Sequence, residues 1–210
     1  MTLRALDLFC CAGGAARGLQ HAGFHVTGID LAPQPNYAGD DFIRGDVPML
    51  SSDLLRTFDF VWASPPCQGF TAYRRRGGHV APRANLIPAT RALLRRAGVP
   101  YVIENVVGAP LETPVLLCGS MFGLDVQRHR IFEPSFHVSA PPCRHEIWTP
   151  RYPPATNRKN LRKTVEVGVW RIPLAVQQRA MGIDWMTREE LSQAIPPAYS
   201  KFLAMEYLRS

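Results

Sequence analysis

Short apolar runs alternate with polar turns along the first half of the chain. They cover residues 3–9, 25–29, 58–63 and 101–106, and each ends at a polar or turn-forming residue. Apolar runs of this length, bounded by turn signals, are typical of buried strands. Because helical patterns stand between them, the order predicts an α/β fold with a doubly wound, mainly parallel sheet and helices on both faces.

Helical spacing is predicted at residues 15–22, 85–97 and 199–208. A further helix is expected to begin after Thr187, because Glu190 three residues later completes the pattern of a capping box. In the segment 85–97, the spacing gives one polar and one apolar face. The residues expected to face outward are Arg91, Arg95 and Arg96, and those expected to face inward are Leu86, Ala89, Ala92 and Leu93.

A proline-framed cysteine follows the third apolar run directly, in Ser64-Pro65-Pro66-Cys67-Gln68-Gly69-Phe70. The prolines end the strand, because they cannot donate to a sheet ladder and their φ is fixed. Open α/β sheets carry their active sites at the carboxyl ends of the strands, which is where this turn puts Cys67. The alternative is an inert buried cysteine, the commoner state of a lone thiol.

A glycine turn follows the first apolar run, where Cys10-Cys11-Ala12-Gly13-Gly14 leads into the helix predicted at 15–22. This order brings backbone N–H groups and a helix N-terminus up to a ligand. Asp30 ends the second run and is placed to accept hydrogen bonds from ribose hydroxyls, and Asp46 could reach an adenine edge. Together they indicate an adenosine-containing cofactor, although two glycines alone are more often a simple tight turn.

Two more polar groups follow later in the chain. Glu104 stands near the end of the run 101–106, as either a capped or salt-bridged strand end or a general acid with a raised pKa. Arg128-His129-Arg130 puts two arginines on one face of an extended segment. Alone, those arginines would be interpreted as a solvated basic strand.

Taken in order, these motifs resemble the cytosine-C5 DNA methyltransferase family, and the length resembles its compact bacteriophage members. The ordered set is specific, whereas any one motif could arise by chance. The motifs that carry the resemblance are Asp7 to Gly14 for the cofactor loop, Pro65-Pro66-Cys67-Gln68 for the nucleophile, Glu104-Asn105-Val106 for the acid, Arg128-His129-Arg130 for the arginine motif, and Gln193-Ala194-Ile195-Pro196-Pro197 for the closing motif.

The resemblance implies a Rossmann-like methyltransferase fold and S-adenosylmethionine as the methyl donor, with S-adenosylhomocysteine as product. It implies that Cys67 bonds to C6 of a flipped cytosine, that Glu104 binds and protonates the base, and that Arg130 with Arg128 stabilises charge. The implied cofactor-binding residues are Phe9, Cys10, Cys11, Ala12, Gly13, Gly14, Asp30, Leu31, Asp46, Val47, Pro65 and Gln193.

Three alternatives stay open. The same chemistry could act on RNA. A modified group could be transferred from a variant cofactor, because Cys11 stands where the family usually has glycine and would be strained at a positive φ. The protein could also bind DNA without catalysis, although a site without catalytic activity gives no physical reason for Cys67, Glu104 and Arg130 to occur together.

The resemblance implies double-stranded DNA as the partner, and the basic composition is compatible with it. The chain has 24 Lys and Arg against 17 Asp and Glu, a net charge of +7, which suits a polyanion. Arginines after Cys67 predict a loop that closes over the target with phosphate contacts. The predicted nucleic-acid contacts are Gln68, Arg74, Arg75, Arg76, Arg151, Arg158, Lys159, Arg162 and Lys163.

Three parts of the chain are predicted, a cofactor-binding catalytic core at 1–132, a small target-recognition lobe or loop at 133–172, and a segment at 173–210 that returns to the core. The 5 cysteines show no disulfide or zinc spacing. Cys143-Arg144-His145 could supply two ligands, but no second pair is evident, so no metal is expected. Without a signal peptide or apolar span, a monomeric cytoplasmic protein of a bacterium or phage-infected host is expected.

Overall fold

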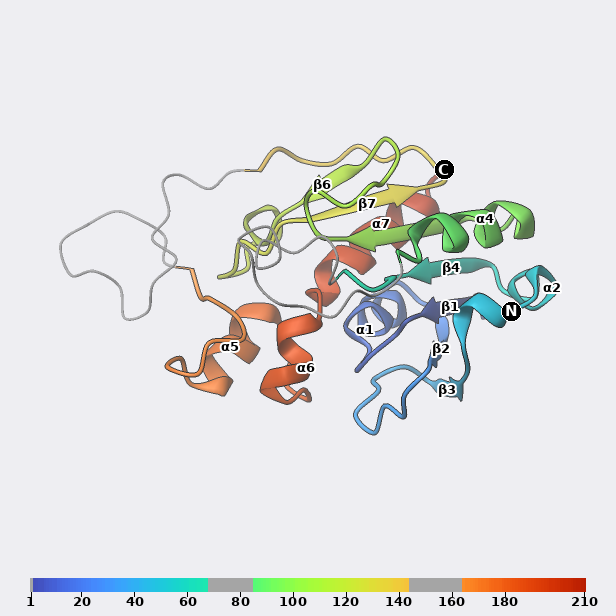
Figure 1. The fold of residues 1–210 in the computed structure, drawn as a ribbon. Helices are drawn as coiled ribbons and strands as arrows, with labels where there is room; N and C mark the ends of the chain where they lie inside the picture. The colour runs from blue at the N-terminus through green and yellow to red at the C-terminus, as the bar shows by residue number, and fades with distance from the viewer. Residues whose placement is uncertain (1, 68–84, 144–163) are drawn as a thin grey trace.

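The computed structural model describes residues 2–67, 85–143 and 164–210 (Figure 1). Within these residues the chain forms a seven-stranded sheet in the order β3-β2-β1-β4-β5-β7-β6. The strands are β1 Arg4–Leu8, β2 His25–Asp30, β3 Asp41–Arg44, β4 Phe60–Ala63, β5 Tyr101–Asn105, β6 Val115–Leu117 and β7 Arg130–Pro134.

The first five strands of that order are parallel, and β7 runs antiparallel to its two neighbours, β5 and the edge strand β6. The prediction of a doubly wound, mainly parallel sheet is therefore confirmed. Because β1, β2, β4 and β5 are parallel, their carboxyl ends meet at one edge of the sheet. The polar residues that end the apolar runs are brought together there.

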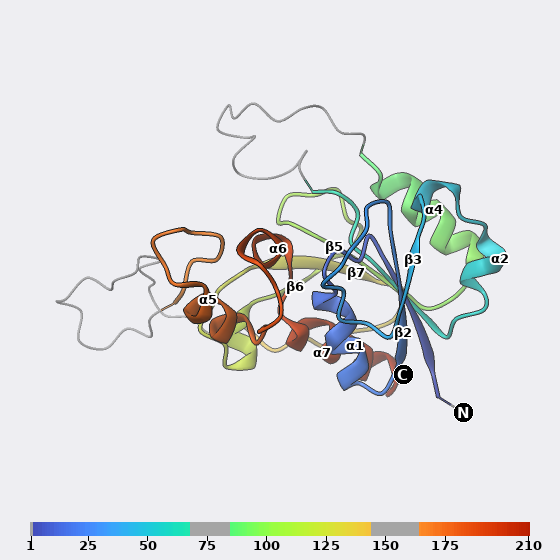
Figure 2. The same cartoon turned by 90° about the horizontal axis from the view of Figure 1, so that it is seen from below.

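Helices cover both faces of the sheet (Figure 2). Alternation along β4 explains the two layers, because Phe60 and Trp62 pack in the core under α1 and α7, while Val61 and Ala63 pack under α2 and α4. The helices are α1 Gly14–His21, α2 Ser52–Leu55, α4 Ile87–Ala97, α5 Leu174–Met181, α6 Arg188–Gln193 and α7 Pro197–Tyr207, with 3₁₀ turns η1 Val47–Met49 and η2 Gly119–Phe122.

The predicted faces of α4 are partly wrong. Leu93 is buried and Arg95 and Arg96 are exposed, as expected, but Ala89 and Ala92 face solvent and Arg91 is buried. The buried stripe follows Ile87, Thr90, Leu94 and Ala97, and Arg91 lies on it. A guanidinium is tolerated there because the carboxylate of Glu133 on β7 lies 2.7 Å away.

The expected start of α6 is confirmed. The backbone N–H of Glu190 donates to Oγ1 of Thr187, and the N–H of Thr187 donates to Oε2 of Glu190, which together form a capping box. Helix α6 follows α5 at the side of the sheet where the strand carboxyl ends lie (Figure 1). No helix among the described residues is long and apolar enough to span a bilayer.

Gly18 permits the close contact between α1 and α7. A Cβ on Gly18 would lie 2.0 Å from Oγ of Ser200 and 2.1 Å from the carbonyl oxygen of Pro197. Gly18→Ala is therefore expected to lower the free energy of unfolding by about 1–3 kcal/mol, as overpacking does. Urea unfolding measures the effect, with the exposed His21→Ala as control. Equal stability of the two variants would contradict the close packing.

Candidate active site

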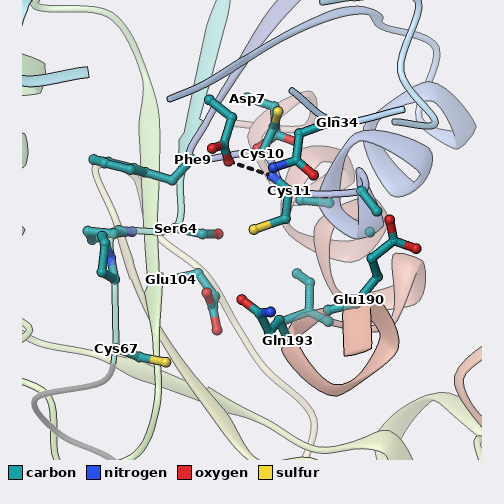
Figure 3. A pocket seen from close by; sticks show the side chains of 18 of the residues that line it. Asp7, Phe9, Cys10, Cys11, Gln34, Ser64, Cys67, Glu104, Glu190 and Gln193 are labelled. Atoms are coloured by element: carbon teal, nitrogen blue, oxygen red, sulfur yellow. Dashed lines mark hydrogen bonds between the residues drawn. The ribbon is translucent and has the colours of Figure 1, made fainter. Parts of the chain in front are cut away.

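A pocket of about 640 Å³ opens at the carboxyl ends of the parallel strands. Its volume lies in the range of small-molecule sites, about 300–1,000 Å³. The residues that line it come from the turns after β1, β2, β3 and β4, from β5 and β7, and from α6 and the segment after it (Figure 3). The predicted cofactor residues that line it are Phe9, Cys10, Cys11, Ala12, Gly14, Asp30, Leu31, Asp46, Val47, Pro65 and Gln193.

The cofactor loop bends through unusual backbone angles. Phe9 and Cys11 have φ values of 59° and 44°. Cys11 therefore has the positive φ at which its side chain is expected to be strained. The N–H of Cys11 donates to Oδ2 of Asp30 over 3.0 Å, which ties the loop to the end of β2. Gly13, with φ of 79°, caps α1 without lining the pocket, and a Cβ there would lie 2.8 Å from the backbone nitrogen of Ala38.

Cys67, Glu104 and Arg130 line another part of the same pocket. The sulfur of Cys67 and the carboxyl of Glu104 point into it (Figure 3). Nε of Arg130 lies 3.2 Å from Oε1 of Glu104, so this arginine orients the acid. The side chain of Asn105 donates to the carbonyl oxygen of Pro65 over 2.9 Å, which holds the proline turn against β5.

Burial and neighbouring charges set the pKa values of Cys67 and Glu104. Burial raises the pKa of the Cys67 thiol, and the carboxylate of Glu104 raises it further, against the opposing effect of Arg130. Burial likewise raises the pKa of Glu104, although Arg130 counteracts it. The site therefore holds a protonated thiol beside a carboxyl that retains its proton more readily than an exposed glutamate.

Arg128 is placed differently from the prediction. Its guanidinium does not line the pocket; it donates to the carbonyl oxygens of Ala194 and Ser192, each over 2.6 Å. Its φ of 39° turns the chain so that this contact forms while the adjacent strand carries Arg130 to the pocket. Arg128 thus holds the end of α6 and the residue after it against the site, and its charge still lowers the pKa of both Cys67 and Glu104.

The family comparison agrees with this geometry. The model of the C-5 cytosine-specific DNA methylase family matches residues 3–110. The chain belongs to the C-5 cytosine-specific DNA methylase family. Within the matched span lie the cofactor loop, the proline-framed cysteine and Glu104, the elements that meet at the pocket.

Two curated type II methyltransferases are similar to this chain. M1.HphI of Haemophilus parahaemolyticus is 32% identical over 122 residues, and M.AgeI of Thalassovita gelatinovora is 30% identical over 121. Each match covers 50% of this chain, but only 33% and 28% of the respective relative. The chain thus spans about a third of the length of these relatives.

Solved structures bear out the methyltransferase fold. The S. pombe Dnmt2 methyltransferase superposes with a TM-score of 0.60, covering 99% of this chain and 100% of its own, at 15% identity. The Entamoeba histolytica methyltransferase EhMeth gives a TM-score of 0.59, covering 99% of this chain and 98% of its own, at 11% identity. At such identities the likeness concerns the fold alone.

Asp7 is a pocket residue to which the sequence analysis gave no role of its own. It is fully buried, and neither carboxylate oxygen has a hydrogen-bond partner among the described residues. Burial, reinforced by the charge of Asp30, raises its pKa well above the ordinary value. The signal available in the sequence was an acid within an apolar run, because burying an unpaired carboxylate in a strand costs free energy.

The predicted DNA contacts all lie outside the described residues. They are Gln68, Arg74, Arg75, Arg76, Arg151, Arg158, Lys159, Arg162 and Lys163. Their roles stay predictions from the sequence.

Glu104→Gln is expected to lower the pKa of the Cys67 thiol, because it removes the negative charge that helps to raise it. Thiolate is the reactive form, so its alkylation rate rises with pH through the pKa. Removal of the Glu104 negative charge should therefore shift the alkylation profile of Cys67 to lower pH. Alkylation by iodoacetamide, followed by mass spectrometry of the Cys67 peptide, measures the shift.

The matched control for that shift is Glu112→Gln, which removes an exposed carboxylate that does not line the pocket. It should leave the Cys67 profile in place. An unchanged or upward-shifted profile in Glu104→Gln would refute the electrostatic coupling of the two groups.

Proposed function

We propose that this protein is a DNA (cytosine-5)-methyltransferase, which transfers a methyl group from S-adenosylmethionine to C5 of a flipped cytosine. The observation that carries this proposal is the meeting of two groups of residues in one pocket. Cys67, Glu104 and Arg130 line one part, and the glycine turn after β1 lines another, with Asp30 and Asp46.

The glycine-turn end of the pocket fits the cofactor. S-adenosylmethionine would supply an electrophilic methyl group on a sulfonium centre. The carboxylate of Asp30 suits ribose hydroxyls and Asp46 suits the adenine edge, while the turn presents the N-terminus of α1. The carboxyl of Asp7, which has no side-chain hydrogen-bond partner among the described residues, adds a polar group beneath this end of the pocket.

The reaction begins at Cys67. Cys67 first loses its thiol proton to a base or to solvent, and the resulting thiolate adds to C6 of the cytosine, which makes C5 nucleophilic toward an electrophilic methyl group. Glu104 binds the N3 and N4 edge and donates a proton to N3 as the thiolate adds, a role that its raised pKa supports. Arg130 stabilises charge on the carbonyl side of the ring and keeps Glu104 oriented through their 3.2 Å contact.

The product is released by elimination. Once C5 carries the methyl group, a base removes the C5 proton, the electron pair restores the C5–C6 double bond, and Cys67 leaves as thiolate. N3 returns its proton to Glu104, which restores the neutral ring and the acid. Arg128 acts in this scheme as a positioning residue, because it holds Ser192 and Ala194, which line the pocket. A cytosine inside a duplex cannot reach these groups, so the base must be flipped out.

Recognition of double-stranded DNA is assigned to the basic segments. The arginines that follow Cys67 would contact phosphates as a closing loop, and residues 133–172 would form the target-recognition lobe between the core and the returning segment 173–210. A monomer is sufficient for this scheme. A phage origin stays a prediction from the length and motifs of the chain.

The test is expression in a bacterial host that lacks cytosine modification, followed by nucleoside mass spectrometry of its DNA and RNA. The proposal predicts 5-methylcytosine in DNA, and its disappearance in Cys67→Ala. A heavier substituent at C5 would instead support transfer of a modified group from a variant cofactor. Modified cytosine in RNA alone, or none in either nucleic acid, would refute the proposal.

A further inference from the structure

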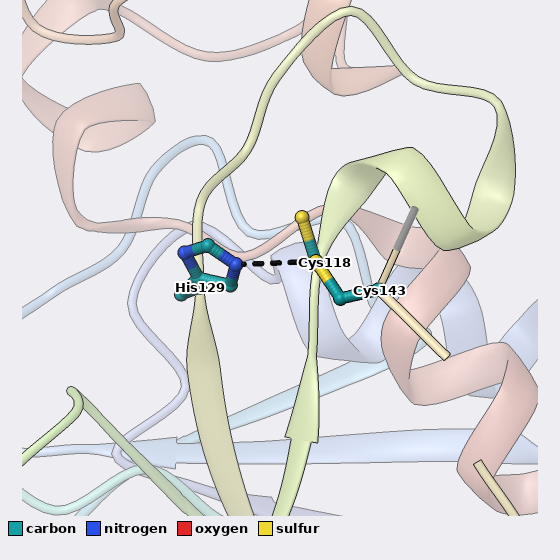
Figure 4. A group of neighbouring side chains, drawn as sticks. All are labelled: Cys118, His129 and Cys143. Atoms are coloured by element: carbon teal, nitrogen blue, oxygen red, sulfur yellow. Dashed lines mark hydrogen bonds between the residues drawn. The ribbon is translucent and has the colours of Figure 1, made fainter. Parts of the chain in front are cut away.

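A second cluster of reactive side chains lies outside the pocket. Cys118 follows β6, His129 precedes β7, and Cys143 lies further along the chain after β7. One ligand atom from each of the three lies within 4.8 Å of the other two (Figure 4). The sequence alone suggested no such grouping, because no zinc-type spacing links these positions.

Strand register explains how the cluster forms. Leu117 of β6 pairs with Arg130 of β7 in an antiparallel ladder. One step further along this ladder, Cys118 and His129 stand opposite each other. The N–H of Gly119 donates to the carbonyl oxygen of Gln127 over 2.7 Å, which holds the two segments together beyond the ladder. Two of the three side chains are therefore fixed by backbone pairing.

The distances suit a tetrahedral metal ion. Nε2 of His129 lies 3.4 Å from Sγ of Cys143. Bond lengths of about 2.3 Å for Zn–S and about 2.0 Å for Zn–N give ligand–ligand edges of about 3.5–3.8 Å in a tetrahedron. The hydroxyl of Ser120 lies 3.3 Å from Sγ of Cys118 and 3.8 Å from Sγ of Cys143, as expected of a group that hydrogen-bonds to metal-bound thiolates.

The cluster is buried on one side and reaches solvent on the other. Cys118 is fully buried, whereas Cys143 is exposed, so an ion can enter from solvent. Two soft thiolates and an imidazole favour zinc over the harder cations that prefer oxygen ligands. Tetrahedral coordination leaves one position for a fourth ligand, water or protein.

We propose that Cys118, His129 and Cys143 bind one Zn²⁺ ion. Binding converts both thiols to thiolates and releases two protons, and no electron is transferred. The ion would join the β6–β7 edge of the sheet to the first part of the predicted recognition lobe, in which Cys143 lies. Because His129 stands between Arg128 and Arg130, it would also fix the arginine motif. This site replaces the expectation that the protein needs no metal, and it does not depend on the proposed reaction.

The experiment is metal analysis of untagged protein purified from zinc-supplemented cells, by inductively coupled plasma mass spectrometry. About one zinc per chain is expected, as for a structural site. Cys143→Ser and His129→Ala should lose the metal, and Cys11→Ser, which alters a thiol in the other pocket, should retain it. Cys143 is exposed, so its variant should still fold, as circular dichroism would verify.

Two further measurements test whether the metal is bound by these residues. Co²⁺ exchanged into the site should show thiolate-to-metal charge-transfer absorption in the wild type but not in Cys143→Ser. A chelator should lower the Tm of the wild type and leave that of Cys143→Ser unchanged. Purified protein without zinc, zinc retained by Cys143→Ser, or a metal-free Cys118–Cys143 disulfide seen by mass spectrometry would each overturn the proposal.

Discussion

Replacing Cys67 with serine is expected to reduce methyl transfer by at least about a thousandfold, because the step that activates the base depends on a sulfur nucleophile. A serine hydroxyl is nearly isosteric but is not ionised at neutral pH. The acid beside it in the described part of the pocket, Glu104, is paired with Arg130 and is needed as an acid, so it does not activate the hydroxyl. Covalent addition at C6 should therefore fail while the pocket keeps its shape.

The measurement is incorporation of labelled methyl groups into DNA, with calorimetry of donor binding beside it. Cys67→Ser should bind S-adenosylmethionine as the wild type does, because the predicted cofactor end is lined by other residues. Glu104→Gln should retain binding too, but lose about 100- to 10,000-fold in rate through the missing acid. A Cys67→Ser enzyme with a tenth of wild-type activity would exclude covalent catalysis.

Arg91→Met is expected to lower the free energy of unfolding by about 3–5 kcal/mol, the cost of removing one partner from a buried ion pair. Only 8% of Arg91 and 3% of Glu133 are exposed, and two N–H groups of the guanidinium contact the carboxylate over 2.7 Å. The arginine also donates to the carbonyl oxygen of Pro110 over 3.0 Å. Among the described residues, methionine would leave the buried Glu133 charge with one hydrogen-bond partner, the N–H of Glu112.

Arg95→Met is the matched control, because Arg95 stands one turn further along α4 and pairs with Glu112 in solvent. Exposed pairs contribute little to stability, so its unfolding midpoint in urea should barely move. The double variant Arg91→Met with Glu133→Leu should recover much of the loss, because it removes both buried charges. Equal effects of Arg91→Met and Arg95→Met would show that the buried ion pair contributes no more to stability than the exposed one.

The sheet and the edge that holds the site could be predicted from the sequence because both depend on local pattern. Each parallel strand is an apolar run that ends in a turn or polar residue, and parallel strands bring those ends together. For this reason the sequence predicts that Cys67, Glu104 and Asp30 lie at this edge of the sheet. The capping box at Thr187 is local too, and it is confirmed.

Features that depend on distant partners were not predictable in this way. Arg91 is buried only because Glu133 lies 42 residues further on, a relation that helical spacing does not contain. The orientation of Arg128 follows from its positive φ and from carbonyl groups more than 60 residues away. The grouping of Cys118 with His129 needs the register of the β6–β7 hairpin, and Asp7 is concealed within an apolar run.

The most direct test of the account is incubation of the protein with S-adenosylmethionine and DNA containing 5-fluorocytosine. Fluorine at C5 cannot leave as a proton does, so Cys67 cannot be eliminated after methyl transfer. The account predicts an adduct that survives denaturing gel electrophoresis, maps to the Cys67 peptide, and is missing in Cys67→Ser. Absence of any adduct, in a preparation that methylates ordinary DNA of the same sequence, would contradict it.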